Sequence, residues 1–386
     1  MIMKKRVVLL RSTPVAPDPP VEKSADALLR AGYEVTIIGW DRDGAECDKS
    51  KRLCLEHGTP EIIRLGIPSF FAGGLKNLMP MAKFQMRLYG WLKAHRNEYD
   101  IIHAFDLDTG LTAERIAKKH GKRLVYHILD FYRDSRNISN VLIKNAMKRA
   151  EFGVINNADA VIICTEKRYE QIAGSHPKKL EVIYNTPKNP DKISDCFDEI
   201  KNSKRCKIVY VGILQEARFL REIIRFTEKD DRFELHIGGF GVMEKEIAEA
   251  AEKCGRIRFY GTLPYDKTLA LENACDIMTA IYDPAVPNHK YAAPNKLYEA
   301  LMLGKPLVAV HNTGFDDIIE KNNIGCLIEY TEAGLADGLN RLIAEMNNHR
   351  SMSEKMKKLY KEHYSWDKME QRLVALYAGL ENAEKR

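Results

Sequence analysis

Short runs of apolar residues recur along the whole chain, and they constrain its fold more than any other feature of the sequence. Before residue 185 the clearest runs are Val7–Leu10, Val35–Ile38, Ile101–Ala104, Leu124–Tyr126 and Ala160–Cys164. After residue 205 they are Lys207–Val211, Phe233–Ile237, Ile257–Tyr260, Asp276–Tyr282, Pro306–Val310 and Cys326–Ile328. Runs that are rich in Val and Ile and do not alternate with polar residues are typical of parallel strands buried on both faces.

The segments between these runs have the pattern of amphipathic helices. Val21, Ala25, Leu28 and Leu29 are spaced for one face of a helix, and Gly32 follows as a stop signal. Strands that alternate with helices predict an α/β fold with right-handed crossovers.

The alternation breaks once, over residues 185–205, a polar stretch with two prolines. A chain of 386 residues is also too long for one ordinary core. We therefore predict an N-terminal Rossmann-like domain over residues 1–188, a linker over 189–205 and a second Rossmann-like domain over 206–365, followed by a last helix over 366–386. Ligands of open parallel sheets bind at the carboxyl ends of the strands, so two such domains predict a site in a cleft between them.

Composition excludes several classes of protein. The chain is 45% hydrophobic and 30% charged, as is usual for a globular protein, and its net charge of +6 permits an anionic partner without requiring one. The sequence has no basic low-complexity tail of the kind that would indicate binding to nucleic acid. The eight cysteines form no CxxC pair and have no zinc-ligand spacing, which predicts reduced thiols and no metal site. The apolar run before Arg11 is too short for a signal peptide, so we expect a cytoplasmic protein.

The strongest candidate for chemistry is the stretch from Pro294 to Glu299. Pro294 is predicted to open a short helix that Gly304 ends. Lys296 and Glu299 then share one face, where the lysine could bind phosphate beside free backbone amides and the glutamate could accept ribose hydroxyls. The alternative is a solvated ion pair on an ordinary surface helix.

This stretch resembles the C-terminal donor motif of family-4-type retaining glycosyltransferases with the GT-B fold. Their pattern is an acidic residue, a Gly-rich loop, a proline and a second glutamate, which binds the ribose of the nucleotide. Pro294 and Glu299 match the proline and the second glutamate, and residues 303–309 match the usual continuation. The resemblance implies a GT-B fold, in which two Rossmann-like parallel-sheet domains face each other across a cleft. It also implies that the last helix, over 366–386, crosses back to the N-terminal domain.

The chain departs from this pattern at the position that contacts the donor sugar in the family. The first acidic position falls on Tyr291, and Ala292 and Ala293 replace the Gly-rich loop before Pro294 and Asn295. The residues implied to contact the donor are therefore Tyr291 to Asn295 and Glu299. His289, Lys290 and Tyr291 are alternatives for the sugar contact.

A second match begins at Gly212. The family has an arginine after this glycine and a lysine five residues later, and both bind the diphosphate. Ile213 replaces the arginine, and Arg218 keeps a cation at the lysine position. The resemblance implies that Arg218 and Lys296 neutralise the leaving diphosphate without a metal ion or other cofactor. Alternatively, Arg218 is a surface residue at the start of a helix.

Shorter matches surround these two. Gly239 belongs to a Gly-x-Gly turn implied to lie beneath the diphosphate or base, and Gly261 and Thr262 precede a loop that cradles the base in the family; a plain turn is the alternative. In the N-terminal half, the resemblance makes Asp106, His127 and Asp130 candidates for the acceptor and sugar side. The family histidine position is Leu129 here, so His127 either replaces it or is a core histidine.

Residues 70–96 combine aromatic and aliphatic residues with five cations. Such a stretch could lie on an anionic membrane surface, or it could be a helix that packs its apolar face on the N-terminal sheet. The two interpretations are compatible.

The resemblance implies transfer of a sugar from a UDP- or GDP-linked donor to a hydroxyl of a glycan or polyprenyl-linked glycan, with retention, in cell-surface polysaccharide or glycoconjugate synthesis. We expect the protein in the cytoplasm, peripheral on the inner face of the membrane. Two alternatives stay open, a sugar-nucleotide epimerase or isomerase and a non-catalytic nucleotide-sugar-binding partner.

Overall fold

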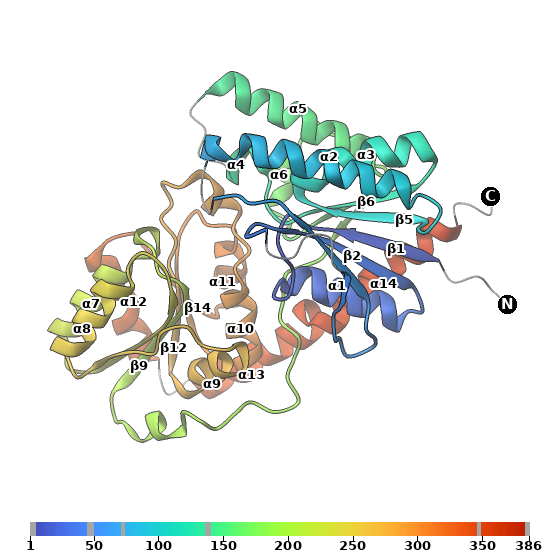
Figure 1. Cartoon of the computed structure of the whole chain (residues 1–386). Helices are drawn as coiled ribbons and strands as arrows, with labels where there is room; N and C mark the ends of the chain where they lie inside the picture. The colour runs from blue at the N-terminus through green and yellow to red at the C-terminus, as the bar shows by residue number, and fades with distance from the viewer. Residues whose placement is uncertain (1–4, 45–49, 71–73, 136–139, 346–348, 383–386) are drawn as a thin grey trace. The chain divides into compact units, whose positions relative to one another are not determined.

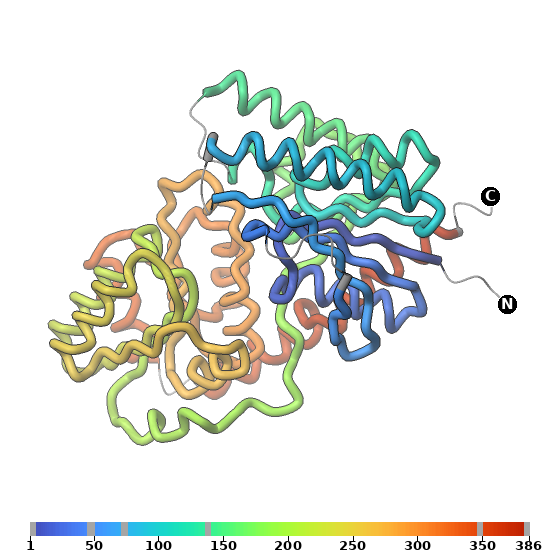
Figure 2. Tube along the Cα trace, viewed as in Figure 1, coloured from blue at the N-terminus to red at the C-terminus, as the bar shows by residue number. Residues whose placement is uncertain are grey.

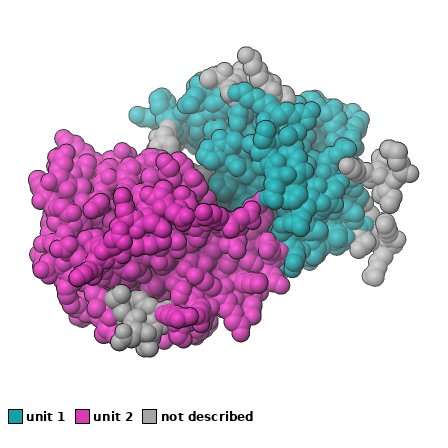
Figure 3. Space-filling model, turned by 90° about the horizontal axis from the view of Figure 1, so that it is seen from below, with its two compact units in different colours: residues 1–184, 369–386 teal, residues 185–368 magenta. Residues whose placement is uncertain are grey.

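Two units make up the chain in the computed structural model, which describes residues 5–44, 50–70, 74–135, 140–345 and 349–382. Unit 1 comprises residues 1–184 and 369–386, and unit 2 comprises residues 185–368 (Figure 3). The chain passes into unit 2 after Tyr184 and returns to unit 1 at Met369, a path that the trace in Figure 2 follows. Residues 189–205, the predicted linker, lie within unit 2 and contain a short 3-10 helix, Asp198–Asn202.

Unit 1 is built on an eight-stranded sheet with the order β3-β4-β2-β1-β5-β6-β7-β8. The strands are β1 (Arg6–Leu10), β2 (Glu34–Asp41), β3 (Ser50–Arg52), β4 (Glu61–Gly66), β5 (Ile101–Phe105), β6 (Arg123–Ile128), β7 (Ala160–Ile163) and β8 (Leu180–Val182). All pairs are parallel except β3 with β4. The central strands are buried along most of their length, as their non-alternating apolar runs predict.

Helices cover both faces of this sheet. They are α1 (Pro19–Arg30), α2 (Leu78–Ala94), α3 (Asp106–His120), α4 (Tyr132–Ser135), α5 (Val141–Asn157), α6 (Arg168–Ile172) and, from Met369 on, α14 (Trp366–Asn382). Figure 1 shows α2, α3 and α5 on one face and α1 with α14 on the other. The predicted helix around Val21 is α1, and Gly32 follows it with a positive φ of 89°.

Unit 2 is built on a six-stranded, fully parallel sheet with the order β11-β10-β9-β12-β13-β14. Its strands are β9 (Cys206–Ile213), β10 (Phe233–Phe240), β11 (Ile257–Phe259), β12 (Ile277–Ala280), β13 (Leu307–Val310) and β14 (Gly325–Ile328). Its helices are α7 (Leu220–Lys229), α8 (Glu244–Lys253), α9 (Tyr265–Ala274), α10 (Asn295–Leu303), α11 (Asp316–Asn322), α12 (Glu332–Ala344) and α13 (His349–Leu359). The core between sheet and helices includes Ile208, Ile237 and Leu335.

The strand order places a topological switch point in each sheet. In unit 2 the first strand of the unit, β9, lies between β10 and β12, which is the order of a doubly wound dinucleotide-binding fold. In unit 1, β1 lies between β2 and β5. At a switch point the connections leave in opposite directions, so the loops at the carboxyl ends of β1 and β5, and of β9 and β12, open a crevice for a ligand.

The α/β fold is confirmed, and every apolar run predicted as a strand forms one. The structure adds β3, β4 and β8. Among the described helices we find none with the length and hydropathy that a bilayer crossing requires.

Candidate active site

Three glycines, Gly212, Gly239 and Gly261, lie together at the carboxyl ends of β9, β10 and β11, and we call them the glycine surface. Gly212 and Gly239 are partners in the register of β9 and β10, and the Gly239 amide donates a hydrogen bond of 2.7 Å to the Gly261 carbonyl. Gly239 has φ +133°, and a Cβ on it would lie 1.8 Å from the Gly212 oxygen. Gly239 is buried, and because no side chain fits there, the backbones of β9 and β10 approach each other closely at this point. Thr262, next to Gly261, is exposed.

Lys296 reaches over this glycine surface from α10. Its Nζ lies 2.7 Å from the point that a Cβ on Gly212 would occupy, and 4.6 Å from the centre of the Tyr210 ring. Burial alone would lower the pKa of Lys296, but the nearby Tyr210, Tyr282, Glu299 and Glu272 outweigh it and raise the pKa. Lys296 is therefore a cation at neutral pH, held by an aromatic face beside Gly212.

Arg218 supplies a second cation at the same switch point. It ends a short 3-10 helix after β9, and its guanidinium carbon lies 3.9 Å above the ring of Tyr282, which follows β12. Arg218 Nη1 lies 3.0 Å from His289 Nε2, and His289 Nδ1 lies 2.8 Å from the Asp283 carbonyl. His289 thus donates through Nδ1 and accepts from Arg218 through Nε2, which requires the neutral ring.

Burial, with a contribution from Arg218, lowers the pKa of His289 and keeps it neutral. Within the described parts of the chain, neither Arg218 nor Lys296 forms an ion pair with a carboxylate. Their charges are therefore not cancelled by a direct partner, which is the arrangement that an anionic ligand requires.

Glu299 lies one turn after Lys296 and is only 4% exposed. Tyr265 at the start of α9 donates a hydrogen bond of 3.1 Å to Glu299 Oε1. This burial contradicts the alternative of a solvated Lys–Glu pair.

A second carboxyl group, that of Glu272 on α9, is 1% exposed, and among the described residues its Oε2 has no hydrogen-bond partner. Burial and the charge of Glu299 raise the pKa of Glu272 well above its ordinary value. The sequence prediction missed both Tyr265 and Glu272. The available signal was a glutamate directly after the apolar residues 269–271.

The helix that carries Lys296 begins one residue later than predicted. Pro294 precedes α10 with an extended ψ of 139°, and Asn295 is its first helical residue. Pro294 is thus the N-cap, because its backbone has not yet turned into the helix. Among the described residues no side chain caps the first amides of α10, which can therefore donate hydrogen bonds to an anion. Gly304 ends the helix with φ +69°, as predicted.

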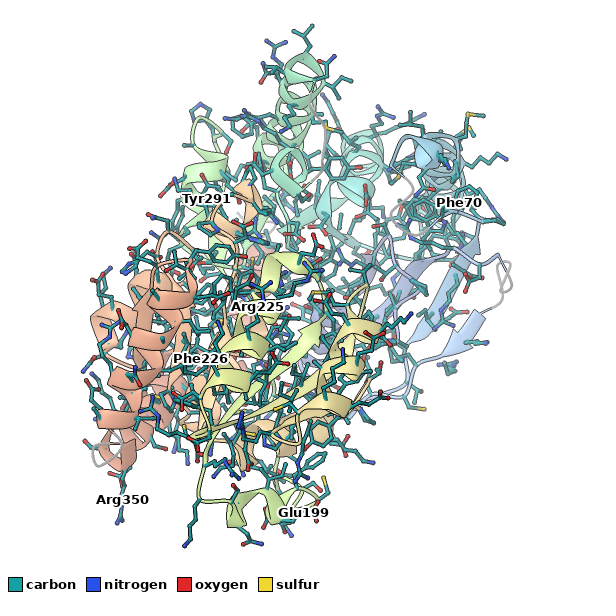
Figure 4. The ribbon with its side chains drawn as sticks, turned by 90° about the vertical axis from the view of Figure 1, so that its left-hand side faces the viewer. Phe70, Glu199, Arg225, Phe226, Tyr291 and Arg350 are labelled. Carbon is teal, nitrogen blue, oxygen red and sulfur yellow. The ribbon has the colours of Figure 1, made fainter. Side chains whose placement is uncertain are left out.

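Tyr291 ends a 3-10 helix, Pro287–Tyr291, and Ala292 and Ala293 continue the strip toward α10 (Tyr291 is labelled in Figure 4). All three are half-buried. The loop after β13 packs closely on this strip, since a Cβ on Gly314 would lie 2.2 Å from the Ala292 oxygen. The Gly314 amide also donates to the His289 carbonyl at 3.2 Å. The sequence prediction missed Gly314, whose only signal was its position after a strand.

At the switch point of unit 1, an arginine joins two carboxylates. Arg11, after β1, donates to Asp18 at 2.9 Å and to Asp106, the first residue of α3. Asp106 also accepts from the backbone amides of Leu129 (2.8 Å) and Asp130 (3.1 Å). It has φ +59°, a strained value for a residue with a side chain. Asp106 therefore ties the loops after β1, β5 and β6 together.

His127 at the end of β6 is 4% exposed and lies in the core. Its Nδ1 is 3.2 Å from His103 Nε2, and His103 Nδ1 is 2.8 Å from the Tyr377 hydroxyl of α14. Burial, followed by the charges of Arg11 and Lys23, lowers the pKa of His127 to about 3. These observations favour the core-histidine interpretation of His127.

Asp130 keeps an exposed carboxylate beside this core. Its side chain is 56% exposed and lies 3.3 Å from Nη2 of Arg168, whose side chain is 3% exposed. Arg168 also donates to the Leu129 carbonyl at 2.6 Å and to Cys164 Sγ at 3.0 Å. A buried arginine thus anchors the segment that presents Asp130 to solvent.

One group of metal-ligand residue types comes together in the described chain, Asp26 with Glu56 and His57. His57 donates its backbone amide to Asp26 at 2.8 Å, and its Nδ1 lies 3.1 Å from the other carboxylate oxygen. These bonds occupy both oxygens of Asp26 and hold the turn at His57 on α1, so the group has a structural explanation.

Two family models match the sequence. The Glycosyltransferase Family 4 model matches residues 21–186, and the Glycosyl transferases group 1 model matches residues 205–345. No curated protein matches the chain.

Solved structures of glycosyltransferases resemble the whole chain. Sucrose-phosphate synthase from Thermosynechococcus elongatus has a TM-score of 0.76 at 16% identity, with 98% of this chain and 100% of that chain covered. Anabaena HepE in complex with UDP and glucose has a TM-score of 0.69 at 15% identity, with 97% and 100% covered. The catalytic domain of starch synthase IV from Arabidopsis thaliana, bound to ADP and acarbose, has a TM-score of 0.66 at 14% identity, with 97% and 100% covered.

Identities this low show the fold alone, and the fold is GT-B. The activity class comes from the two family models, whose matches span the strands β2 to β8 of unit 1 and β9 to β14 of unit 2. The chain belongs to the GT-B glycosyltransferases, with a family 4 domain followed by a group 1 domain.

Proposed function

We propose that this glycosyltransferase moves a sugar from a UDP- or GDP-linked donor to a hydroxyl of a glycan or polyprenyl-linked glycan, with retention, in the synthesis of a cell-surface polysaccharide or glycoconjugate. The observation that carries the proposal is the pair of cations Arg218 and Lys296 at the switch point of unit 2. Lys296 lies beside Gly212, and neither cation forms an ion pair with a carboxylate of the described residues. Similar structures support a nucleoside diphosphate donor, since Anabaena HepE was solved in complex with UDP-glucose.

In the proposed reaction the bond between the sugar's anomeric carbon and the diphosphate oxygen breaks, and the electron pair stays on the diphosphate. Arg218 and Lys296 stabilise that developing charge, and the first amides of α10 add to it. The acceptor oxygen bonds to the anomeric carbon on the same face, and its proton passes to the diphosphate. The protein contributes position and electrostatics and needs no nucleophile. With two side-chain cations at this place, the proposal requires no metal ion.

The remaining predicted residues have these proposed roles. Glu299 accepts the ribose hydroxyls, and Gly239, Gly261 and Thr262 lie beneath the nucleotide. Residues 291–295 contact the donor sugar and its phosphates. In unit 1, Asp106 and the exposed carboxylate of Asp130 belong to the acceptor side. His127 is buried, so we propose that it positions the strand end beside these carboxylates and does not contact the acceptor.

The donor can be identified with a thermal-shift screen of UDP, GDP, ADP and their common sugar derivatives. A true donor at about 100 times its Kd should stabilise the protein by roughly 2.7 kcal/mol. Incubation with the donor, with and without glycan acceptors, then separates the functions by mass spectrometry. Acceptor-dependent release of the nucleoside diphosphate together with an extended glycan supports transfer. A new sugar epimer on the nucleotide would support an isomerase instead, and binding without turnover would support a non-catalytic partner.

A further inference from the structure

Large apolar side chains lie exposed on one part of unit 1. Among the described residues, twelve large hydrophobic side chains are at least 45% exposed, and seven of them lie just before or on α2 and α5. These seven are Phe70 (64%), Leu78 (63%), Met79 (70%), Met86 (66%), Val141 (64%), Leu142 (79%) and Ile143 (45%). Exposed apolar residues scattered singly need no explanation, but a concentration of this kind marks an interaction surface.

The two helices are parts of one layer. Helix α3 packs against both α2 and α5, and Figure 1 shows that α2 and α5 begin at the same end of that layer, where the strands of the sheet finish. Phe70 precedes α2 and is labelled in Figure 4. We call Phe70 with residues 74–96 and 140–150 the α2–α5 surface.

The exposed side chains are not needed for the core of unit 1. Helix α2 buries Phe84, Leu88 and Leu92, spaced four residues apart as one inward stripe. Helix α5 buries residues only from Glu151 on, although its first turn is well formed, since Asn140 Oδ1 accepts from the amides of Leu142 (2.9 Å) and Ile143 (3.2 Å). The first turn of α5 is thus an N-capped helix turn whose apolar side chains are exposed to solvent.

The same surface concentrates positive charge. Residues 74–96 and 140–150 contain eight cations and no aspartate or glutamate, whereas the whole chain has a net charge of +6. The eight are Lys76, Lys83, Arg87, Lys93, Arg96, Lys144, Lys148 and Arg149. The rest of the chain is therefore slightly acidic, and the positive excess of the protein lies on the α2–α5 surface.

We propose that the α2–α5 surface docks on an anionic lipid bilayer, with the exposed apolar side chains in the interfacial region and the cations among the headgroups. Interfacial helices bind by this combination of apolar burial and attraction to anionic lipid, and each Lys or Arg near the surface contributes about 1 kcal/mol. A second copy of the chain fits this surface poorly, because a symmetric contact would bring the eight cations of each copy together. The inference goes beyond the proposed function, since vesicle binding requires neither donor nor acceptor.

The test is sedimentation of the full chain with vesicles of phosphatidylcholine, with and without phosphatidylglycerol. We expect binding only when phosphatidylglycerol is present, and a loss of binding when added salt screens the cations. Equal binding to both kinds of vesicle, or to neither, would overturn the proposal. Self-association detected by light scattering together with absent vesicle binding would assign the surface to a second copy instead.

Paired variants locate the binding surface. Leu142→Gln combined with Ile143→Gln removes apolar area on α5, and Lys83→Glu combined with Lys144→Glu reverses two charges; each pair should weaken vesicle binding by at least ~10-fold. Lys118→Glu on α3 and Lys245→Glu on α8 are controls outside the surface and should bind as the wild type does. A nucleotide-induced thermal shift equal to that of the wild type shows that each variant is folded. Folded variants of the surface that bind vesicles as the controls do would contradict the assignment.

Discussion

The switch points of the two sheets each hold an arginine, but the two arginines have different partners. In unit 1 the loop after β1 supplies Arg11 and the loop after β5 supplies Asp106, and the two form an ion pair that Asp18 completes. In unit 2 the loop after β9 supplies Arg218, which lies on the ring of Tyr282 after β12 and bonds to a neutral imidazole. Equivalent places in two parallel sheets thus hold a neutralised arginine and an arginine that keeps its charge.

The difference separates a structural use of charge from a binding use. A buried guanidinium between two carboxylates fixes loops but offers little to an anion, and removing it leaves two carboxylates without their partner. A guanidinium on an aromatic face is held in position while its charge remains available. The charges of Arg218 and Lys296 in unit 2 therefore fit the diphosphate binding that we propose for this switch point.

Gly239→Ala should produce the largest change at the unit 2 switch point. The new Cβ would lie 1.8 Å from the Gly212 oxygen at a left-handed φ, so we expect the free energy of unfolding to fall by about 4 kcal/mol and nucleotide binding to disappear. Urea unfolding and a nucleotide titration measure both effects. Gly255→Ala is the control, because nothing lies within 4 Å of its Cβ position. Equal behaviour of the two variants would show that the glycine surface is not required.

Arg11→Ala should destabilise the protein by about 3 kcal/mol, since Asp18 and Asp106 lose the cation between them. Arg218→Ala should change the free energy of unfolding by less than about 1 kcal/mol, because no carboxylate in the described part of the chain pairs with Arg218. Urea unfolding at one pH compares the two, with the exposed Arg115→Ala as the baseline for losing an arginine. A larger loss in the free energy of unfolding for Arg218→Ala than for Arg11→Ala would contradict the difference between the units.

The buried carboxyl of Glu151 gives unit 1 a pH-dependent stability. Burial is the main cause that raises the pKa of Glu151 to about 8, and the group binds the Tyr126 hydroxyl and the Tyr132 amide. The unfolded chain loses this proton near pH 4.5 while the folded chain keeps it, so stability falls as the pH rises between these values.

From about pH 5.5 to 7, this loss should reach roughly 2 kcal/mol. Glu151→Gln, which resembles the protonated form, should lack this contribution to the slope. Unfolding free energies of both proteins across this pH range provide the measurement, and parallel curves would contradict the assignment.

Tyr265→Phe should have the smallest effect. The variant loses the hydroxyl that holds Glu299 Oε1, so we expect the KM for the donor to rise about fivefold, close to 1 kcal/mol, with kcat unchanged. Tyr169→Phe, at an exposed tyrosine of α6, serves as the control. A fall in kcat without a change in KM would place Tyr265 in the chemical step rather than in ribose binding.

The parts of the fold that the sequence predicts are those with a local cause. Continuous apolar runs identify the central strands, whereas β4 was missed because Glu61 and Arg64 interrupt its apolar residues, and Glu181 does the same in β8. The site follows the same rule. Glycines after strands and a lysine in a first helical turn are visible in sequence, and Pro294 lies one residue before the helix that it was predicted to open.

What sequence could not predict depends on packing between distant segments. The contact of Arg11 with Asp106 joins residues 95 positions apart, and that of Arg218 with His289 joins residues 71 apart. The burial of Glu272 likewise follows from the packing of α9 in unit 2, not from any motif around it.

The central claim is that Arg218 and Lys296 carry the charge of the leaving diphosphate, and turnover of Arg218→Ala and Lys296→Ala tests it most directly. With a donor and acceptor found by the screen, each variant should lower kcat about 100-fold, the scale of one lost preorganised group. Lys245→Ala, on an exposed side chain of α8, should leave kcat unchanged. A kcat close to the wild-type value in both Arg218→Ala and Lys296→Ala would contradict the account.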